Sequence, residues 1–281
     1  MLTIFLIVLA LIWIIFAVTS DLRTREIPNW LNFSLIIFAL GARLFYSLFN
    51  DDWSFFVQGI IGLTAFFAIA NLLYLSRFFA GGDAKLMIAL GPIIPFESSF
   101  LSNLNLFLNF LFLFFIIRLT YDLISIFYLG LRDSNKVKKE FYKNLKANKK
   151  LGYVFTLFGV VFIILGFFER LLLIPGILVI ILPYLYFYTK AIENKSLIEK
   201  INSKEITEGD WLYKDVKVGR NVIKANWDGL SKKDMLAIRK KYKSVLIKRG
   251  IQFGPGFLII FLIFVYLYFS GIDLWNSLWQ P

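Results

Sequence analysis

The sequence contains neither cysteine nor histidine among its 281 residues. Without cysteine the chain cannot form a disulfide or present a thiolate nucleophile, and without both residue types it lacks the usual ligands of zinc. Hydrolysis by a serine–histidine or cysteine–histidine pair is excluded for the same reason. The sequence also has no phosphate-binding loop, and we expect neither a metal nor a cofactor. Any hydrolytic chemistry would therefore rest on Asp, Glu, Lys, Ser, Thr or Tyr side chains.

Charged residues are also few, at 18%, whereas 58% of the residues are hydrophobic and the mean hydropathy is +0.70. This composition is typical of a polytopic membrane protein and not of a soluble domain. The formal net charge is +12. In a membrane protein such an excess collects on cytoplasmic loops, so it predicts contact with membrane lipids and not with nucleic acid.

Apolar runs that alternate with polar connections predict membrane-crossing helices, each of which needs about 20 apolar residues. The runs are Leu2–Thr19, Trp30–Phe49, Trp53–Leu75, Leu86–Phe96, Leu104–Leu131, Leu151–Phe168, Leu171–Tyr188 and Gly256–Ser270. The fourth and the last are short, which leaves open whether they cross fully. The first run lacks a preceding basic region and is not expected to be a cleavable signal peptide. We therefore predict an all-α polytopic membrane protein with about six to eight transmembrane helices.

Lysine and arginine are concentrated in every second connection between these runs. The basic connections hold Arg23 and Arg25, then Arg77 and Lys85, then the lysines of residues 136–150. The connections at residues 50–52 and 97–103 carry neither residue type. Since basic loops stay on the cytoplasmic side, the N-terminus is predicted to lie outside the cell.

Residues 190–254 hold sixteen basic and eight acidic residues without a run long enough to cross a membrane. We expect a small soluble α+β insert in the cytoplasm. The segments Asp210–Val218 and Val222-Ile223 are predicted strands. Ser231 is predicted to cap a helix whose apolar stripe continues through Lys248; the stripe consists of Met235, Ile238, Tyr242, Val245 and Leu246. Asp210 and Asp228 are interpreted as turn residues.

An acidic residue, Asp83, lies between the third and fourth apolar runs and follows Gly81-Gly82. An ionisable residue at such depth is costly and is a candidate for function. Glycine would let another backbone approach this carboxylate closely. The simpler interpretation is a helix break, in which glycine ends one helix and Asp83 caps the next.

A second carboxylate, Asp21, directly follows the first apolar run and is predicted to lie on the same side of the membrane as Asp83. An Asp closing the first span, Ile27-Pro28-Asn29 opening the second, and Gly82-Asp83-Ala84-Lys85 together resemble the prepilin peptidase family. The similarity is greatest to its archaeal branch, which cleaves preflagellins and prepilins. The signature of this family is Gly-x-Gly-Asp, and Ala80 departs from it at the first position.

The resemblance implies a membrane-embedded aspartic endopeptidase with Asp21 and Asp83 as its catalytic dyad. Gly81, Gly82, Lys85, Pro28 and Asn29 are the implied supporting or substrate-binding residues. The implied substrates are preflagellins or type IV prepilin-like proteins, cut after a short basic leader at the cytoplasmic face of the cell membrane. Glu26 or acidic residues of the insert are candidates to hold that leader.

This interpretation predicts a transmembrane catalytic core at residues 1–189, a soluble domain at 190–254 and a C-terminal transmembrane segment at 255–281. It leaves open the oligomeric state and which aspartate acts as the base.

Other interpretations remain open at this level. A multi-span protein with a basic insert is also compatible with a non-catalytic platform for pilus or flagellum assembly, or with an inactive relative of the peptidases. A transporter would be consistent with the broken segment at Asp83. Arg118 and Asp122 lie four apart within the fifth run and form either a self-contained ion pair or a group that acts on the dyad.

Overall fold

A computed structural model describes residues 2–219, 221–226 and 229–277 of the chain. The chain divides into two compact units, one formed by residues 1–122 with 251–281 and the other by residues 123–250. Within the described residues, six helices are long and apolar enough to cross a membrane, and a small sheet region accompanies them. The predicted fold class, a polytopic helical membrane protein with a small α+β insert, is confirmed.

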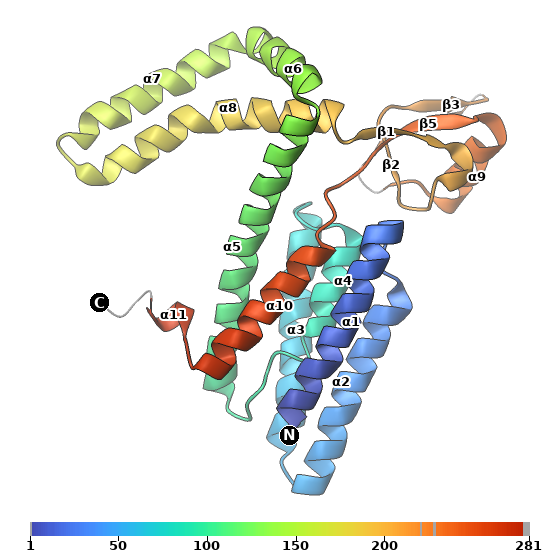
Figure 1. Ribbon diagram of the computed structural model, residues 1–281, viewed down its shortest axis with the longest axis vertical. Helices are drawn as coiled ribbons and strands as arrows, with labels where there is room; N and C mark the ends of the chain where they lie inside the picture. Colours follow the sequence, from blue (N-terminus) through green and yellow to red (C-terminus); the bar gives the residue numbers. More distant parts are fainter. Residues whose placement is uncertain (1, 220, 227–228, 278–281) are drawn as a thin grey trace. The chain divides into compact units, whose positions relative to one another are not determined.

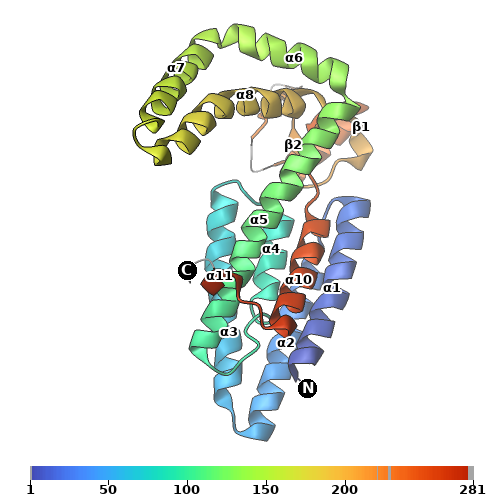
Figure 2. The ribbon, with the colours of Figure 1, turned by 60° about the vertical axis from the view of Figure 1, so that its left-hand side comes forward.

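The first unit is a bundle in which helices from both ends of the chain lie side by side (Figures 1 and 2). Its helices are α1 (Leu2–Thr24), α2 (Asn29–Asn50), α3 (Trp53–Leu75), α4 (Gly81–Leu90), the first part of α5 (Phe100–Arg132), α10 (Gly254–Ser270) and α11 (Leu274–Ser277). Helix α1 packs against α2 and α10, whereas α4 packs against α2 and α3. The last long helix of the chain thus becomes a neighbour of the first.

The polar turn at residues 50–52 determines where α2 ends and α3 begins. Asp51 adopts the left-handed backbone conformation (φ 51°) that closes α2. The side chain of Asp52 accepts a hydrogen bond from the amide of Ser54 at 3.2 Å and so caps α3. These local signals explain why Trp53–Leu75 was predicted with the bounds that the structure has.

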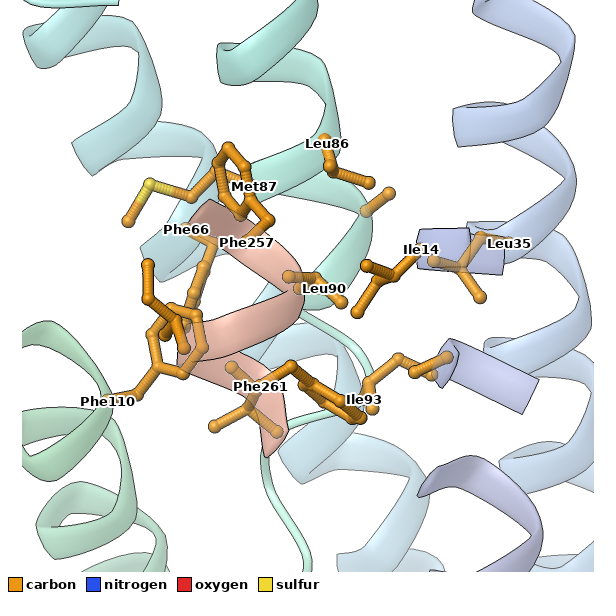
Figure 3. Packing of buried hydrophobic residues seen from close by; sticks show 14 of the residues in the cluster. Ile14, Leu35, Phe66, Leu86, Met87, Leu90, Ile93, Phe110, Phe257 and Phe261 are labelled. Carbon is orange, nitrogen blue, oxygen red and sulfur yellow. The ribbon is translucent and has the colours of Figure 1, made fainter. Parts of the chain in front are cut away.

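Apolar side chains from every long helix of the first unit meet in one core (Figure 3). The labelled members are Ile14 of α1, Leu35 of α2, Phe66 of α3, Leu86, Met87 and Leu90 of α4, Ile93, Phe110 of α5, and Phe257 and Phe261 of α10. The core therefore fixes α4 from several sides, although this helix is only ten residues long.

Helix α4 spans about 15 Å, roughly half of the hydrocarbon layer. The irregular chain that follows it is buried, and the side chain of Arg43 from α2 satisfies its carbonyls. Arg43 is fully buried and donates hydrogen bonds to the carbonyls of Pro92 at 2.6 Å, Ile93 at 3.3 Å and Pro95. It also bonds the carbonyl of Phe55 at 2.8 Å. Non-helical backbone at membrane depth is tolerated when protein groups satisfy it in this way.

The second unit joins a helical part to the small α+β insert. Its helices are the end of α5, α6 (Ser134–Ala147), α7 (Lys149–Gly166), the short 3-10 helix η1 (Arg170–Leu172) and α8 (Leu173–Lys195). Helices α7 and α8 pack as an antiparallel pair, and the chain turns between Gly166 and Leu173 (Figure 1). Helix α6 was not predicted, because the lysines of residues 136–150 were interpreted as a basic connection between two apolar runs.

The insert contains a three-stranded antiparallel sheet of order β1-β5-β2 and a separate hairpin of β3 and β4. Its elements are β1 (Ile198–Asn202), the 3-10 helix η2 (Ser203–Glu205), β2 (Trp211–Leu212), β3 (Val216–Val218), β4 (Asn221–Ile223), α9 (Lys232–Lys241) and β5 (Ser244–Lys248). The strand predicted at Asp210–Val218 is divided between β2 and β3. The strand at Val222-Ile223 is confirmed. Asp210 lies in a turn and accepts a hydrogen bond from the amide of Thr207 at 2.8 Å, while Asp228 is outside the described residues.

The predicted helix from Ser231 through Lys248 is correct only in its first part. Ser231 caps α9 and accepts a hydrogen bond from the amide of Asp234 at 3.2 Å, as predicted. The helix ends at Lys241, and Val245 and Ile247 then alternate into the core as part of β5. Because β5 pairs with both β1 and β2, it is the central strand of the sheet, and this long-range pairing overrides the helical spacing.

Candidate active site

Asp21 lies in the last turn of α1 and is buried, with 7% of its surface exposed. Its contacts come from the far end of the chain. The amide of Gly254 donates a hydrogen bond to Asp21 Oδ2 at 2.9 Å, and the side chain of Gln252 donates one to the Asp21 carbonyl. The start of α10 therefore holds Asp21 in place.

Gly254 is the residue that makes this approach possible. A Cβ atom at position 254 would lie 2.7 Å from Asp21 Oδ2 and 3.1 Å from Asp21 Cβ. Contacts under 3.0 Å essentially never occur for a real Cβ atom. Only glycine allows the backbone of α10 to donate to this carboxylate at the observed distance.

Asp83 is the third residue of α4 and is also buried, with 8% of its surface exposed. The N-cap of α4 is Ala80, so Asp83 is not the capping residue that the helix-break interpretation predicted. Its position in the first turn still places the carboxylate near the positive end of the helix dipole. Arg118 of α5 approaches Asp83, with 3.7 Å between Nη1 and Oδ2.

The two carboxyl groups lie close enough to interact electrostatically. Helices α1 and α4 both pack against α2, which brings together acids that lie 62 positions apart in the sequence. The grouping of Asp21 with Asp83 as a catalytic dyad stays a prediction.

Polar side chains from little more than one turn of α5, residues 118–122, complete the surroundings of the acids. Arg118 Nε donates to Asp122 Oδ2 at 2.8 Å, and its guanidinium lies 4.2 Å from the ring centroid of Phe253. The hydroxyl of Tyr121 donates to the carbonyl of Gln252 at 2.9 Å. Both interpretations of Arg118 fit this geometry, because the residue is paired with Asp122 and also faces Asp83.

The remaining predicted site residues lie at the adjoining ends of α2 and α4. Lys85 Nζ donates to Asn29 Oδ1 at 2.7 Å, which links the two helix starts. Pro28 is the N-cap residue of α2, with φ −60°. Gly81 and Gly82 form the first turn of α4, so their backbones are helical. A Cβ atom at Gly82 would meet Ile27 at 3.5 Å, an ordinary contact distance.

Sequence reasoning did not identify Tyr121, Gln252 and Gly254 as part of these surroundings. The sequence Gly254-Pro255-Gly256 at the head of the last apolar run was the signal that marked a close helix approach. Across residues 2–219, 221–226 and 229–277, no group of three or more acidic side chains is arranged to hold a metal ion.

Comparison with known proteins finds a similarity in the region that holds the two acids. Residues 8–124 match the type IV leader peptidase family. Over 97 residues the chain is 30% identical to a preflagellin peptidase of Methanococcus maripaludis, covering 34% of this chain and 42% of that protein. It is 31% identical over 103 residues to a preflagellin peptidase of Methanocaldococcus jannaschii, covering 36% and 44%. A prepilin peptidase of Methanothermobacter thermautotrophicus is 34% identical over 97 residues, covering 34% and 24%.

The chain spans less than half the length of the curated relatives it matches. No solved structure matches it. The resemblance to leader peptidases predicted from the sequence is therefore confirmed for residues 8–124, the region of the type IV leader peptidase family that holds both Asp21 and Asp83.

Proposed function

We propose that the chain is a membrane-embedded aspartic endopeptidase that removes short basic leaders from preflagellin-like or type IV prepilin-like precursors. One observation carries the proposal. Two carboxylates, Asp21 and Asp83, are both buried and both lie within the segment that matches leader peptidases. Relatives named as preflagellin and prepilin peptidases support the substrate class. Without cysteine or histidine in the chain, a carboxylate pair is the simplest hydrolytic device available.

The proposed reaction follows from two carboxyl groups in one site. Both cannot ionise easily, so one keeps its proton near neutral pH. The ionised group removes a proton from a water molecule while the water oxygen bonds to the scissile carbonyl carbon. The protonated group donates a hydrogen bond to the carbonyl oxygen, where negative charge develops. The carbon–nitrogen bond then breaks, and a proton passes to the leaving amine. The pair acts as a unit, and the two roles are properties of that pair.

Residues of α5 and α10 would keep this pair in position. The Gly254 amide and Gln252 fix Asp21, and Arg118 faces Asp83 while it is anchored by Asp122. A carboxylate pair works only if both groups keep their geometry to within a fraction of an ångström. These contacts therefore have a positioning role in the proposal.

The substrate would enter as an extended chain beside the first turn of α4. A helical substrate hides its carbonyls, whereas an extended one presents them to the dyad. Gly81 and Gly82 keep this side of Asp83 free of bulk, and Lys85 and Asn29 hold the adjoining helix starts together. Acidic groups such as Glu26 are candidates to attract a basic leader.

We further propose that the acids face the cytoplasm and that the N-terminus lies outside. The alternation of basic and neutral connections supports this orientation. The same scheme assigns residues 1–189 to the transmembrane core, residues 190–254 to a soluble cytoplasmic domain and residues 255–281 to a final transmembrane segment. All strands of the described chain, from Ile198 to Lys248, lie within the proposed soluble domain.

The decisive experiment replaces each aspartate by asparagine and measures leader removal. Asp21→Asn and Asp83→Asn are nearly isosteric but cannot take up a proton, so each should abolish cleavage of a co-expressed preflagellin precursor on a mobility gel. Asp51→Asn is the matched control, because Asp51 is exposed and asparagine tolerates its left-handed backbone. Near-parental cleavage by either dyad variant would contradict the proposal and favour a non-catalytic assembly platform.

A further inference from the structure

Helix α6 connects two helices that are candidates to cross the membrane. It begins two residues after α5 ends and stops two residues before α7 begins. Both flanking helices are long and apolar enough to cross a membrane. A helix of fourteen residues, about 21 Å long, that joins two such spans is expected close to the membrane surface.

The apolar side of α6 is already covered within its own unit. Val137 is 1% exposed and packs with Ala191 and Ile192 of α8. Phe141 packs against the same cluster, and its ring lies 6.1 Å from that of Tyr188. Helix α6 therefore does not need the membrane interior to bury its apolar residues.

The opposite side of α6 carries a stripe of lysines. Lys136, Lys139, Lys143 and Lys146 recur at intervals of three and four residues, so they lie on one helical face. All four are exposed, and the side chains of Lys136 and Lys143 are 72% and 74% exposed. We call these four residues the lysine stripe.

Little negative charge on this segment offsets the stripe. Residues 134–150 contain seven lysines and a single acid, Glu140. Glu140 is largely buried and already pairs with Lys143 at 3.8 Å and with Lys195 of α8 at 3.4 Å. Asp133, just before the helix, pairs with Lys136 at 4.0 Å. The stripe still carries a net positive charge, because Lys139 and Lys146 add to the two paired lysines.

We propose that the lysine stripe binds the anionic headgroups of phospholipids in the surrounding membrane. Headgroup phosphates are the anions nearest to a helix that two spans hold at the surface. Each lysine near an anionic membrane contributes favourably, and long flexible stems let the ammonium groups reach the phosphates. The exposed aromatic ring of Tyr142, next to the stripe, suits the same interfacial region. This binding goes beyond the proposed peptidase activity and does not depend on it.

The test uses the full chain purified in a neutral detergent, where micelles have no inner and outer side. The chain has no cysteine, so Asn135→Cys provides a single position for an environment-sensitive dye beside the stripe. Mixed micelles with increasing phosphatidylglycerol are titrated, with phosphatidylcholine as the neutral comparison. We expect a saturable dye response to phosphatidylglycerol that high salt suppresses.

Three variants distinguish binding by the stripe from an effect of the overall positive charge. Replacing the four stripe lysines by glutamine should raise the phosphatidylglycerol fraction at half-response by about tenfold or more. The matched control replaces four exposed lysines of the insert, Lys204, Lys224, Lys232 and Lys233, by glutamine and should leave the response unchanged. Replacing the stripe lysines by arginine keeps the charge and should preserve binding.

Several outcomes would overturn the proposal. An equal response to the two lipids would show that charge is not recognised, and an unchanged response in the glutamine stripe variant would show that the stripe is not the site. A stronger response to an oligonucleotide or to an acidic peptide than to phosphatidylglycerol would assign the surface to a different partner.

Discussion

Replacing Gly254 by alanine tests whether the start of α10 is part of the candidate active site. The added Cβ atom would lie 2.7 Å from Asp21 Oδ2. Ordinary contact begins at 3.4 Å, so Asp21 or the backbone of α10 must retreat by about 0.7 Å. A small rotation of the Asp21 side chain would not remove the clash, because the same Cβ atom would also lie 3.3 Å from Asp21 Cγ.

We expect Gly254→Ala to lower the rate of cleavage more than the stability of the fold. A displacement of this size in a buried contact costs about 1–3 kcal/mol of stability. A shift approaching 1 Å in a reacting group can lower a rate by about 100-fold. We therefore expect Gly254→Ala to lower kcat/KM for leader removal by roughly 100-fold while most of the protein still folds. Purified enzyme and a preflagellin precursor on a mobility gel give the rate, and thermal unfolding in detergent gives the stability.

Gly41→Ala is the control for this variant. Gly41 lies within α2 of the same unit, and a Cβ atom there would meet nothing within 4 Å. The substitution should leave cleavage unchanged and stabilise the helix by up to about 1 kcal/mol. If Gly254→Ala cleaves as fast as Gly41→Ala, the contact of α10 with Asp21 has no part in catalysis and the positioning argument is wrong.

Three further substitutions or labels test other parts of the structure. Arg43→Met should destabilise the protein by about 3–5 kcal/mol in thermal unfolding, because it leaves buried carbonyls of residues 92–95 without donors; an unchanged unfolding temperature would contradict the role given to Arg43. Arg118→Met should lower kcat and move the acid limb of the pH–rate profile to higher pH, because it removes the cation that favours the ionised form of Asp83. Arg118→Lys keeps a cation and should move the acid limb less. Single cysteines at Asp51 and Ser99 should react with a membrane-impermeant thiol reagent on intact cells while cysteines at Asn148 and Ser196 should not; the reverse labelling pattern would invert the proposed orientation.

The membrane-crossing elements could be predicted from sequence because their signals are local. The apolar run Trp53–Leu75 is bounded by a polar turn with its own cap, and the structure has the same helix. The central strand β5 could not be predicted in this way. Its residues also fit a helical stripe, and only pairing with β1, whose sequence lies more than 40 positions away, decides between the two.

Helix α6 shows a different reason for a missed element. Its lysines dominate the composition and suggest a loop, whereas Val137 and Phe141 repeat at the spacing of a helix that has a packed side. The weak apolar signal becomes meaningful only when α8 is known to lie against it. Composition alone therefore underestimates short surface helices next to membrane spans.

For the candidate site as well, local sequence signals predict some features, whereas contacts between distant residues are not predictable from them. The two acids could be grouped from sequence, since the alternation of basic connections predicts that they lie on one side of the membrane. The groups that hold them could not, because the hydrogen bond between Asp21 and Gly254 joins residues 233 positions apart. Family similarity ends at residue 124, whereas Gln252, Phe253 and Gly254 lie far beyond it. The similar region thus contains both carboxylates but only one of the two helices that support them. A segment limited to residues 8–124 would leave the Asp21 carboxylate without its backbone donor, so the proposed site includes the start of the last long helix.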